Sequence, residues 1–248
     1  MSQAGQIILV AFGAASEASH AVYAHVENAF RARYPAHDFR WAYTSRFVAR
    51  KLQSEGAEVS SLEMVAASLR EKPRPVVFQS LHIAPGAEFH RARELVDALG
   101  LPMGKPLLSV KKDQDALVDA VEEMLHPTWT NLAVIHGNEK VAAYAAPFQA
   151  LAQALEERYP HLVAQSLEGA PGDERLDEVR VRAQASGGVH FIPLMLSKGK
   201  HVLEDVLGEK PESWKSIVAA PAESCAPTLG KNAKALEIFF RHLDDVLA

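Results

Sequence analysis

Two histidines stand where proteins with parallel sheets place their reactive side chains. His136 directly follows the apolar run 132–135, and His201 comes shortly after the apolar run 189–194. Glu168 ends another apolar run that lies between them in the sequence. Two imidazoles and a carboxylate form a donor set that suits first-row divalent metals. One histidine at a strand end is more often a surface or structural residue, but three such residues together favour a metal site.

Apolar runs that alternate with helical patterns must position these residues. We predict strands at 7–12, 39–43, 75–81, 106–110, 132–135, 161–167, 189–194 and 217–220. Helical patterns connect the runs. They include 139–159, where Pro147 predicts a kink or break, and a short one at 201–206. Strands alternating with helices predict an α/β protein whose mostly parallel sheets are covered on both faces.

The sequence contains an internal duplication. Residues 7–13 (IILVAFG) align with 131–137 (NLAVIHG), and residues 76–88 (VVFQSLHIAPGAE) align with 189–201 (VHFIPLMLSKGKH). Both aligned pairs run from a predicted strand into the loop that follows it. The chain therefore reads as two copies of one α/β unit.

The duplication predicts two similar Rossmann-like or flavodoxin-like parallel-sheet domains. We assign residues 1–110 to the first domain and residues 111–248 to the second, which carries both metal-binding histidines. A closing helix at 230–247 is expected to pack on the first half. Two such halves should face each other across a central cleft at the carboxyl ends of their strands, where α/β sheets bind ligands.

The alignment of the halves also identifies counterparts of the two histidines. Phe12 corresponds to His136, and Glu88 corresponds to His201. His82 lies at the end of another predicted strand and could line the same cleft. The first half therefore offers an apolar ring and a carboxylate where the second half offers imidazoles.

Composition excludes several classes of function. The chain has 248 residues, and 26 basic against 31 acidic side chains give a net charge of −5, so we expect neither a nucleic-acid nor a membrane partner. Cys225 is the single cysteine, which excludes an intrachain disulfide and fits a reducing cytoplasm. We see no signal peptide and expect a cytoplasmic protein. Neither a P-loop nor a GxGxxG turn is present, so no organic cofactor is predicted.

Five sequence strings together resemble one family along nearly the whole chain. They are FGAAS (12–16), AYTSRFVARKL (42–52), QSLHIAPGAEF (79–89), VIHG (134–137) and PLMLSKGKHVLEDV (193–206). The chain resembles the anaerobic-type sirohydrochlorin cobaltochelatases, which are class II chelatases related to ferrochelatase. Any one string is weak, but the combination is specific. The resemblance implies the chelatase fold and the insertion of Co²⁺ into a tetrapyrrole, sirohydrochlorin, in cobalamin biosynthesis.

The resemblance also implies roles for particular residues. It makes His136, Glu168 and His201 the ligands of Co²⁺, with His136 and His201 also accepting the pyrrole protons. Glu88 matches a further acidic residue that faces the cleft, and we expect it to carry protons away. The metal is a substrate here, and Fe²⁺ could take its place.

A polycarboxylate substrate requires locally basic surface despite the negative net charge. The candidates for substrate binding are Arg46, Lys140, Lys198, Lys200 and His82, all close to predicted strand ends. Each basic side chain alone is more often a solvated surface charge. An exposed ion pair contributes at most about 1 kcal/mol, so several would have to act together.

Two alternatives to a cobalt chelatase stay open on the sequence. One is a ferrochelatase of the same fold that acts on sirohydrochlorin or a porphyrin, because Co²⁺ and Fe²⁺ are neighbours in ligand affinity. The other is a non-catalytic protein that binds a tetrapyrrole or a metal. The family resemblance further leads us to expect a homo-oligomer.

Overall fold

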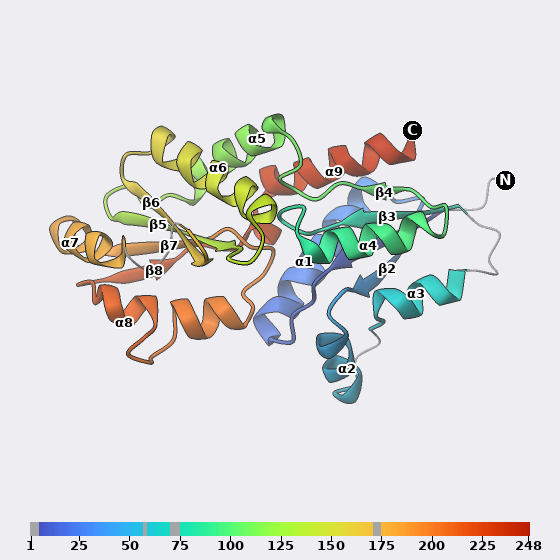
Figure 1. Ribbon diagram of the computed structural model, residues 1–248, viewed down its shortest axis with the longest axis horizontal. Helices are drawn as coiled ribbons and strands as arrows, with labels where there is room; N and C mark the ends of the chain where they lie inside the picture. The colour runs from blue at the N-terminus through green and yellow to red at the C-terminus, as the bar shows by residue number, and fades with distance from the viewer. Residues whose placement is uncertain (1–4, 57–58, 70–74, 171–174) are drawn as a thin grey trace. The chain divides into compact units, whose positions relative to one another are not determined.

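The computed structural model describes residues 5–56, 59–69, 75–170 and 175–248. The chain divides into two compact units, and each has its own four-stranded sheet (Figure 1). The first unit is Met1–Ser109 with Leu236–Ala248, and the second is Val110–Ala235. No helix within the described ranges is long and apolar enough to cross a membrane.

The first unit is a parallel sheet with helices between its strands. Its strands are β1 (Gln6–Ala11), β2 (Asp38–Tyr43), β3 (Val76–Ser80) and β4 (Met103–Gly104), in the order β2-β1-β3-β4. Its helices are α1 (Glu17–Arg33), α2 (Arg46–Ser54), α3 (Leu62–Leu69) and α4 (Ala87–Asp97). Most of the C-terminal helix α9 (Ala233–Leu247) also belongs here. Phe240 of α9 packs edge-on against Phe30 of α1, with ring centroids 4.8 Å apart.

The second unit repeats this plan. Its strands are β5 (Thr130–Gly137), β6 (Leu162–Glu168), β7 (Val189–Pro193) and β8 (Glu223–Cys225), all parallel and in the order β6-β5-β7-β8. Its helices are α5 (Lys111–Val121), α6 (Ala142–Arg158), α7 (Leu176–Ser186) and α8 (Trp214–Val218), with 3₁₀ turns η1 (Glu122–Met124) and η4 (Leu229–Lys231) and the π-helical turn η3 (His201–Val206).

The matching strand orders confirm the α/β class and the duplication that the sequence predicts. β1 and β5 take the same central place in their sheets, with neighbours on both sides. The side chains of β1 are all buried, and so are those of β5 apart from His136 near its end. A strand covered on both faces carries apolar residues without alternation, which is why these runs are conspicuous in the sequence.

The strand predicted at 106–110 is wrong. The fourth strand of the first sheet is the two-residue β4, and the segment after it is a loop. Leu107 and Leu108 are buried, and their N–H groups donate to the carbonyl oxygens of His82 and Ile83 in the loop after β3. The apolar residues at 107 and 108 are therefore buried because two loops pack together, and not because they form a strand. Buried backbone groups need hydrogen-bond partners whether or not they lie in a sheet.

The strand predicted at 217–220 is also wrong. α8 covers its first two residues and ends at Val218, and the next residue, Ala219, has a left-handed backbone with φ of 45°. The last strand, β8, follows at Glu223–Cys225. Pro147 does not break α6, which runs from Ala142 to Arg158. It lies in the second turn, so only one hydrogen bond near the helix start is lost.

Candidate metal centre

The end of β5 places His136 where its ring leaves the core. The strand is buried up to Ile135, and His136 is half-buried. Gly137 follows with φ of +76°, a left-handed backbone that glycine adopts without strain. A Cβ atom at Gly137 would lie 2.0 Å from the backbone oxygen of Glu168. The glycine after the histidine therefore allows β5 and β6 to approach each other at this point.

Glu168 is the last residue of the neighbouring strand. β6 pairs in parallel with β5, and the register puts Glu168 opposite Gly137. Its side chain is half-buried. Strand pairing thus brings the end of β6 beside the end of β5, where the Glu168 carboxylate and the His136 imidazole each offer a ligand atom.

His201 is supplied by the π-helical turn η3, which it begins. Val202 and Val206 of this turn are buried and anchor it to the unit, while His201 is exposed. The Nδ1 atom of His201 lies 2.7 Å from an Oδ2 atom of Asp205 one turn later. π-Helical turns are rare and occur often at functional sites.

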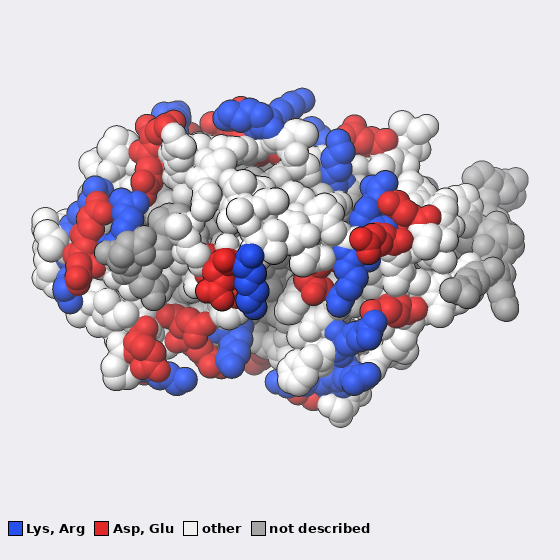
Figure 2. Space-filling model, viewed as in Figure 1, with Lys and Arg blue, Asp and Glu red and all other residues white. Residues whose placement is uncertain are grey.

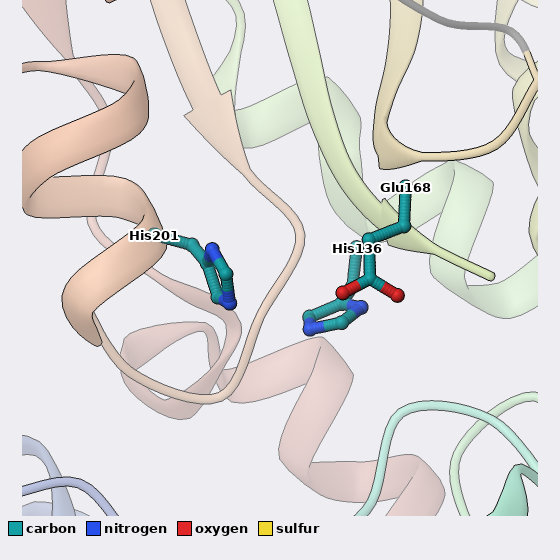
Figure 3. A group of neighbouring side chains, drawn as sticks. All are labelled: His136, Glu168 and His201. Atoms are coloured by element: carbon teal, nitrogen blue, oxygen red, sulfur yellow. The ribbon is translucent and has the colours of Figure 1, made fainter. Parts of the chain in front are cut away.

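The three side chains converge on one point (Figure 3). His136, Glu168 and His201 each offer a ligand atom, and these atoms all lie within 4.8 Å of one another. The two imidazole rings are 5.4 Å apart between centroids and nearly perpendicular, at 83°. Donor atoms around a bound first-row ion stand about 3 Å apart, so a small closure of side chains suffices to bind one.

The arrangement suits a metal that must be both held and passed on. Three donors leave coordination positions free for further ligands, as in metal sites that act on a substrate. The Nδ1 atom of His136 faces the carbonyl oxygen of Gly137 at 3.2 Å. With Nδ1 of both rings directed at oxygen acceptors, both Nε2 atoms are available to a metal.

The predicted basic residues of the second unit have different surroundings. Lys200 is exposed and lies 3.9 Å from Glu204. Lys140 is exposed and has no ion-pair partner in the described part of the chain. Lys198 lies near the thiol of Cys225, where burial raises the pKa of that thiol and the lysine offsets part of the rise.

The predicted site residues of the first unit are held by other charges. Arg46 binds Glu63 at 2.8 Å, and Glu88, in the first turn of α4, binds Arg91 at 2.8 Å. On the face drawn in Figure 2, Lys and Arg side chains are interleaved with Asp and Glu. The basic side chains predicted to bind substrate therefore include paired ones, and their role stays a prediction.

His82 is more enclosed than the sequence suggests. Its Nδ1 atom is 2.9 Å from the Ser80 hydroxyl, while its Nε2 atom is buried and has no hydrogen-bond partner. Burial, with a smaller contribution from the Arg91 charge, lowers the pKa of His82 from 6.5 to about 4. This imidazole is therefore neutral near pH 7, which does not favour a direct ion pair with a carboxylate.

Sequence reasoning missed Asp205. The prediction of a helix at 201–206 already contained the signal, because residues four apart on a helical turn are neighbours. Asp205 lies inside the turn that follows β7 and not at a strand end, where the other candidate residues were predicted.

Comparison with solved structures places the fold. The chain resembles the sirohydrochlorin chelatase SirB from Bacillus subtilis subspecies spizizenii in complex with cobalt, with a TM-score of 0.62 at 15% identity over 99% of this chain and 95% of that one. SirB from Bacillus subtilis with Fe³⁺ is similar with a TM-score of 0.63 at 13% identity, covering 100% and 96%. At these identities the likeness shows the shared fold.

Comparison of sequences is more specific. The chain is 30% identical over 254 residues to the sirohydrochlorin cobaltochelatase CbiKC of Nitratidesulfovibrio vulgaris, covering 96% of this chain and 88% of the relative. It is 29% identical over 236 residues to the sirohydrochlorin cobaltochelatase of Salmonella typhimurium, covering 89% and 88%. The family model described as cobalt chelatase (CbiK) matches residues 5–248. With nearly its whole length matched, this chain belongs to the cobalt chelatase (CbiK) family.

Proposed function

We propose that this protein is a chelatase that inserts Co²⁺ into sirohydrochlorin and holds the ion with His136, Glu168 and His201. The observation that carries the proposal is the convergence of these three side chains within 4.8 Å in a chain of the cobalt chelatase family. Its relatives named above are sirohydrochlorin cobaltochelatases. Imidazole and carboxylate ligands suit Co²⁺, and three of them leave positions open for pyrrole nitrogens.

Metal insertion has two chemical requirements. The ion must arrive with part of its water shell removed, and two pyrrole N–H protons must leave as the metal–nitrogen bonds form. The triad meets the first need because its ligands replace water around the ion. It meets the second because the nitrogen of an imidazole released from the metal is a base that can accept a pyrrole proton.

Other predicted residues have supporting roles in this proposal. Glu88 carries protons away from the reaction, and Arg46, Lys140, Lys198 and Lys200 contribute to holding the peripheral carboxylates of the substrate. His82 is kept as a substrate contact only through its apolar ring surface, because its free nitrogen is buried. A homo-oligomer and a cytoplasmic location stay predictions.

The test is a metallation assay under anaerobic conditions. The purified protein is mixed with sirohydrochlorin and equal concentrations of Co²⁺ and Fe²⁺, and the products are identified by absorption and mass spectrometry. We expect cobalt sirohydrochlorin over many turnovers, at a rate well above that of a reaction without protein. The double variant His136→Ala/His201→Ala is the control for metallation in solution.

Two outcomes would overturn the proposal. Iron sirohydrochlorin as the main product would make the protein a ferrochelatase. A shifted tetrapyrrole spectrum without turnover would make it a binding protein.

A further inference from the structure

The two imidazoles of the triad are backed by different partners. Nδ1 of His201 lies 2.7 Å from a carboxylate oxygen of Asp205. Nδ1 of His136 lies 3.2 Å from the carbonyl oxygen of Gly137, the next residue in the chain. A short contact to a charged acceptor is roughly twice as strong as a neutral hydrogen bond. The site therefore contains one firmly held ring and one that is held more weakly.

We propose that Asp205 is a positioning residue that fixes the tautomer and orientation of His201, so that His201 presents Nε2 to the incoming Co²⁺. The inference rests on the proposed function of the triad and adds a residue outside it. A carboxylate accepts hydrogen bonds and does not donate them, so Nδ1 of His201 must carry the hydrogen. The lone pair of a neutral imidazole is then on Nε2.

The local structure keeps this contact in place. His201 and Asp205 are four residues apart on η3, whose backbone is anchored by the buried Val202 and Val206. In the described ranges, Asp205 forms its ion pair with His201, whereas its neighbour Glu204 reaches back toward Lys200 at 3.9 Å. Of the two basic side chains His201 and Lys200, it is therefore His201 that pairs with the Asp205 carboxylate.

The solvent exposure of the His201–Asp205 pair indicates that it serves metal binding more than folding stability. The side chains of His201 and Asp205 are 48% and 52% exposed. An ion pair this open to water adds little to folding stability. A carboxylate behind a metal-binding histidine, in contrast, typically changes metal affinity or activity by 10–100-fold.

The experiment measures Co²⁺ binding without any tetrapyrrole. Wild type, Asp205→Ala and Asp205→Asn are titrated anaerobically with Co²⁺ by calorimetry and by the visible absorption of the bound ion. Glu204→Gln is the matched control, because it removes one negative charge from the same turn without touching His201. We expect the Co²⁺ dissociation constant to rise about 10–100-fold in Asp205→Ala, less in Asp205→Asn, and hardly at all in Glu204→Gln.

A second measurement reads the tautomer itself. ¹⁵N NMR of the metal-free protein should show His201 with its hydrogen on Nδ1 in wild type and a mixture of tautomers in Asp205→Ala. A loss of folding would alter the whole spectrum, whereas a positioning role alters the His201 signals alone.

The outcomes separate this inference from the proposed function. Wild-type Co²⁺ affinity in Asp205→Ala, with affinity lost in His201→Ala, overturns the role of Asp205 and leaves the triad intact. A wild-type His201 with its hydrogen on Nε2 also overturns it. A protein that binds Co²⁺ in this way but never inserts it refutes the proposed function while the inference about Asp205 stands.

Discussion

At the scale of single residues, the candidate site depends on nitrogen atoms that hydrogen bonds leave free. His136 and His201 both direct Nδ1 at an oxygen, so their Nε2 atoms can reach a metal. Replacing either histidine by alanine should lower the rate of Co²⁺ insertion by about 100-fold or more, because a ligand and a proton acceptor are lost together. Turnover and circular dichroism measure the effect.

The control for these variants is His20→Ala, an exposed histidine on α1. It should insert Co²⁺ at the wild-type rate. If both His136→Ala and His201→Ala kept more than about a tenth of wild-type turnover, the assignment of the triad would fail.

Glu168 should contribute to the metal chiefly through its charge. The substitution Glu168→Gln keeps the size of the side chain but leaves a neutral amide, which is a poorer ligand than a carboxylate. We expect Co²⁺ to bind at least several-fold more weakly, while sirohydrochlorin binds almost as before. Calorimetric titration with each ligand alone checks this. Unchanged Co²⁺ affinity would give Glu168 a structural role.

The lowered pKa of His82 predicts that the folding stability depends on pH. Its pKa is about 4 in the folded protein and near 6.5 in the unfolded chain, so the unfolded state binds more protons between these values. The stability associated with neutral His82 is therefore complete above about pH 6.5 and is lost as the pH falls toward 4. In denaturant unfolding, the free energy of unfolding should fall less between pH 6.5 and pH 4 in His82→Gln than in wild type. The difference should reach about 2–3 kcal/mol at pH 4. Equal pH dependence in both proteins would contradict a neutral imidazole with a buried Nε2 atom.

The triad could be predicted at this scale because His136 and Glu168 directly follow two predicted strands, and His201 begins the helical pattern that comes after a third. Asp205 does not follow a strand, so only its spacing of four residues from His201 in the predicted helix at 201–206 signals it, and that spacing does not show which nitrogen of the ring it binds. The pairing of Arg46 with Glu63, and the nearness of Lys198 to Cys225, also depend on side-chain packing that one sequence does not reveal.

At the scale of elements, Gly137 links the fold to the site. Gly137→Ala would put a Cβ atom 2.0 Å from the backbone oxygen of Glu168 and would force a left-handed backbone on alanine. The left-handed backbone alone costs roughly 1–2 kcal/mol. We expect lower stability and at least a tenfold loss of Co²⁺ affinity, measured by thermal unfolding and calorimetry.

Gly199→Ala is the matched control for this prediction. Gly199 lies two residues before His201, and no atom outside its chain neighbours lies within 4 Å of a Cβ atom built there. This variant should bind Co²⁺ like wild type. If Gly137→Ala behaved in the same way, the close approach of β5 and β6 would not be needed for the metal site.

The long elements were predictable, and the short strands at the sheet edges were not. β1 and β5 carry unbroken apolar runs at 7–11 and 132–135 because both faces are covered, a signal that needs no knowledge of the fold. β4 has two residues and β8 has three, too few for a pattern. The apolar residues at 107 and 108 belong to a buried loop, and a sequence pattern cannot separate this from a strand.

At the scale of the whole molecule, charge should govern substrate binding. If exposed lysines attract a polycarboxylate, its KM should rise with ionic strength while kcat changes little, because such contacts act equally on bound substrate and transition state. The double variant Lys140→Gln/Lys200→Gln should raise KM severalfold at low salt and flatten its salt dependence. Lys111→Gln/Lys112→Gln on α5 removes the same charge and should leave KM near wild type. Equal effects of the two double variants would show that only net charge matters.

The duplication explains how one fold offers the candidate metal triad in the second unit, while the described residues of the first unit contain no such group. Both units have the same strand order, yet the residues at matching positions of the aligned halves differ: Phe12 corresponds to His136, and Glu88 corresponds to His201. The strand pattern predicts where reactive residues can lie. Their chemistry depends on the residue types that each copy carries at those positions.

The central claim is that the Co²⁺ held by the triad is the ion that enters the macrocycle. The direct test loads the protein with one equivalent of radioactive Co²⁺, removes the free ion, and mixes the complex anaerobically with sirohydrochlorin and an excess of a strong chelator as a trap. We predict that most of the label appears in cobalt sirohydrochlorin, and that it goes to the chelator when His136→Ala/His201→Ala replaces the wild type. Label recovered on the chelator from the wild-type protein, with the tetrapyrrole left metal-free, would contradict the account.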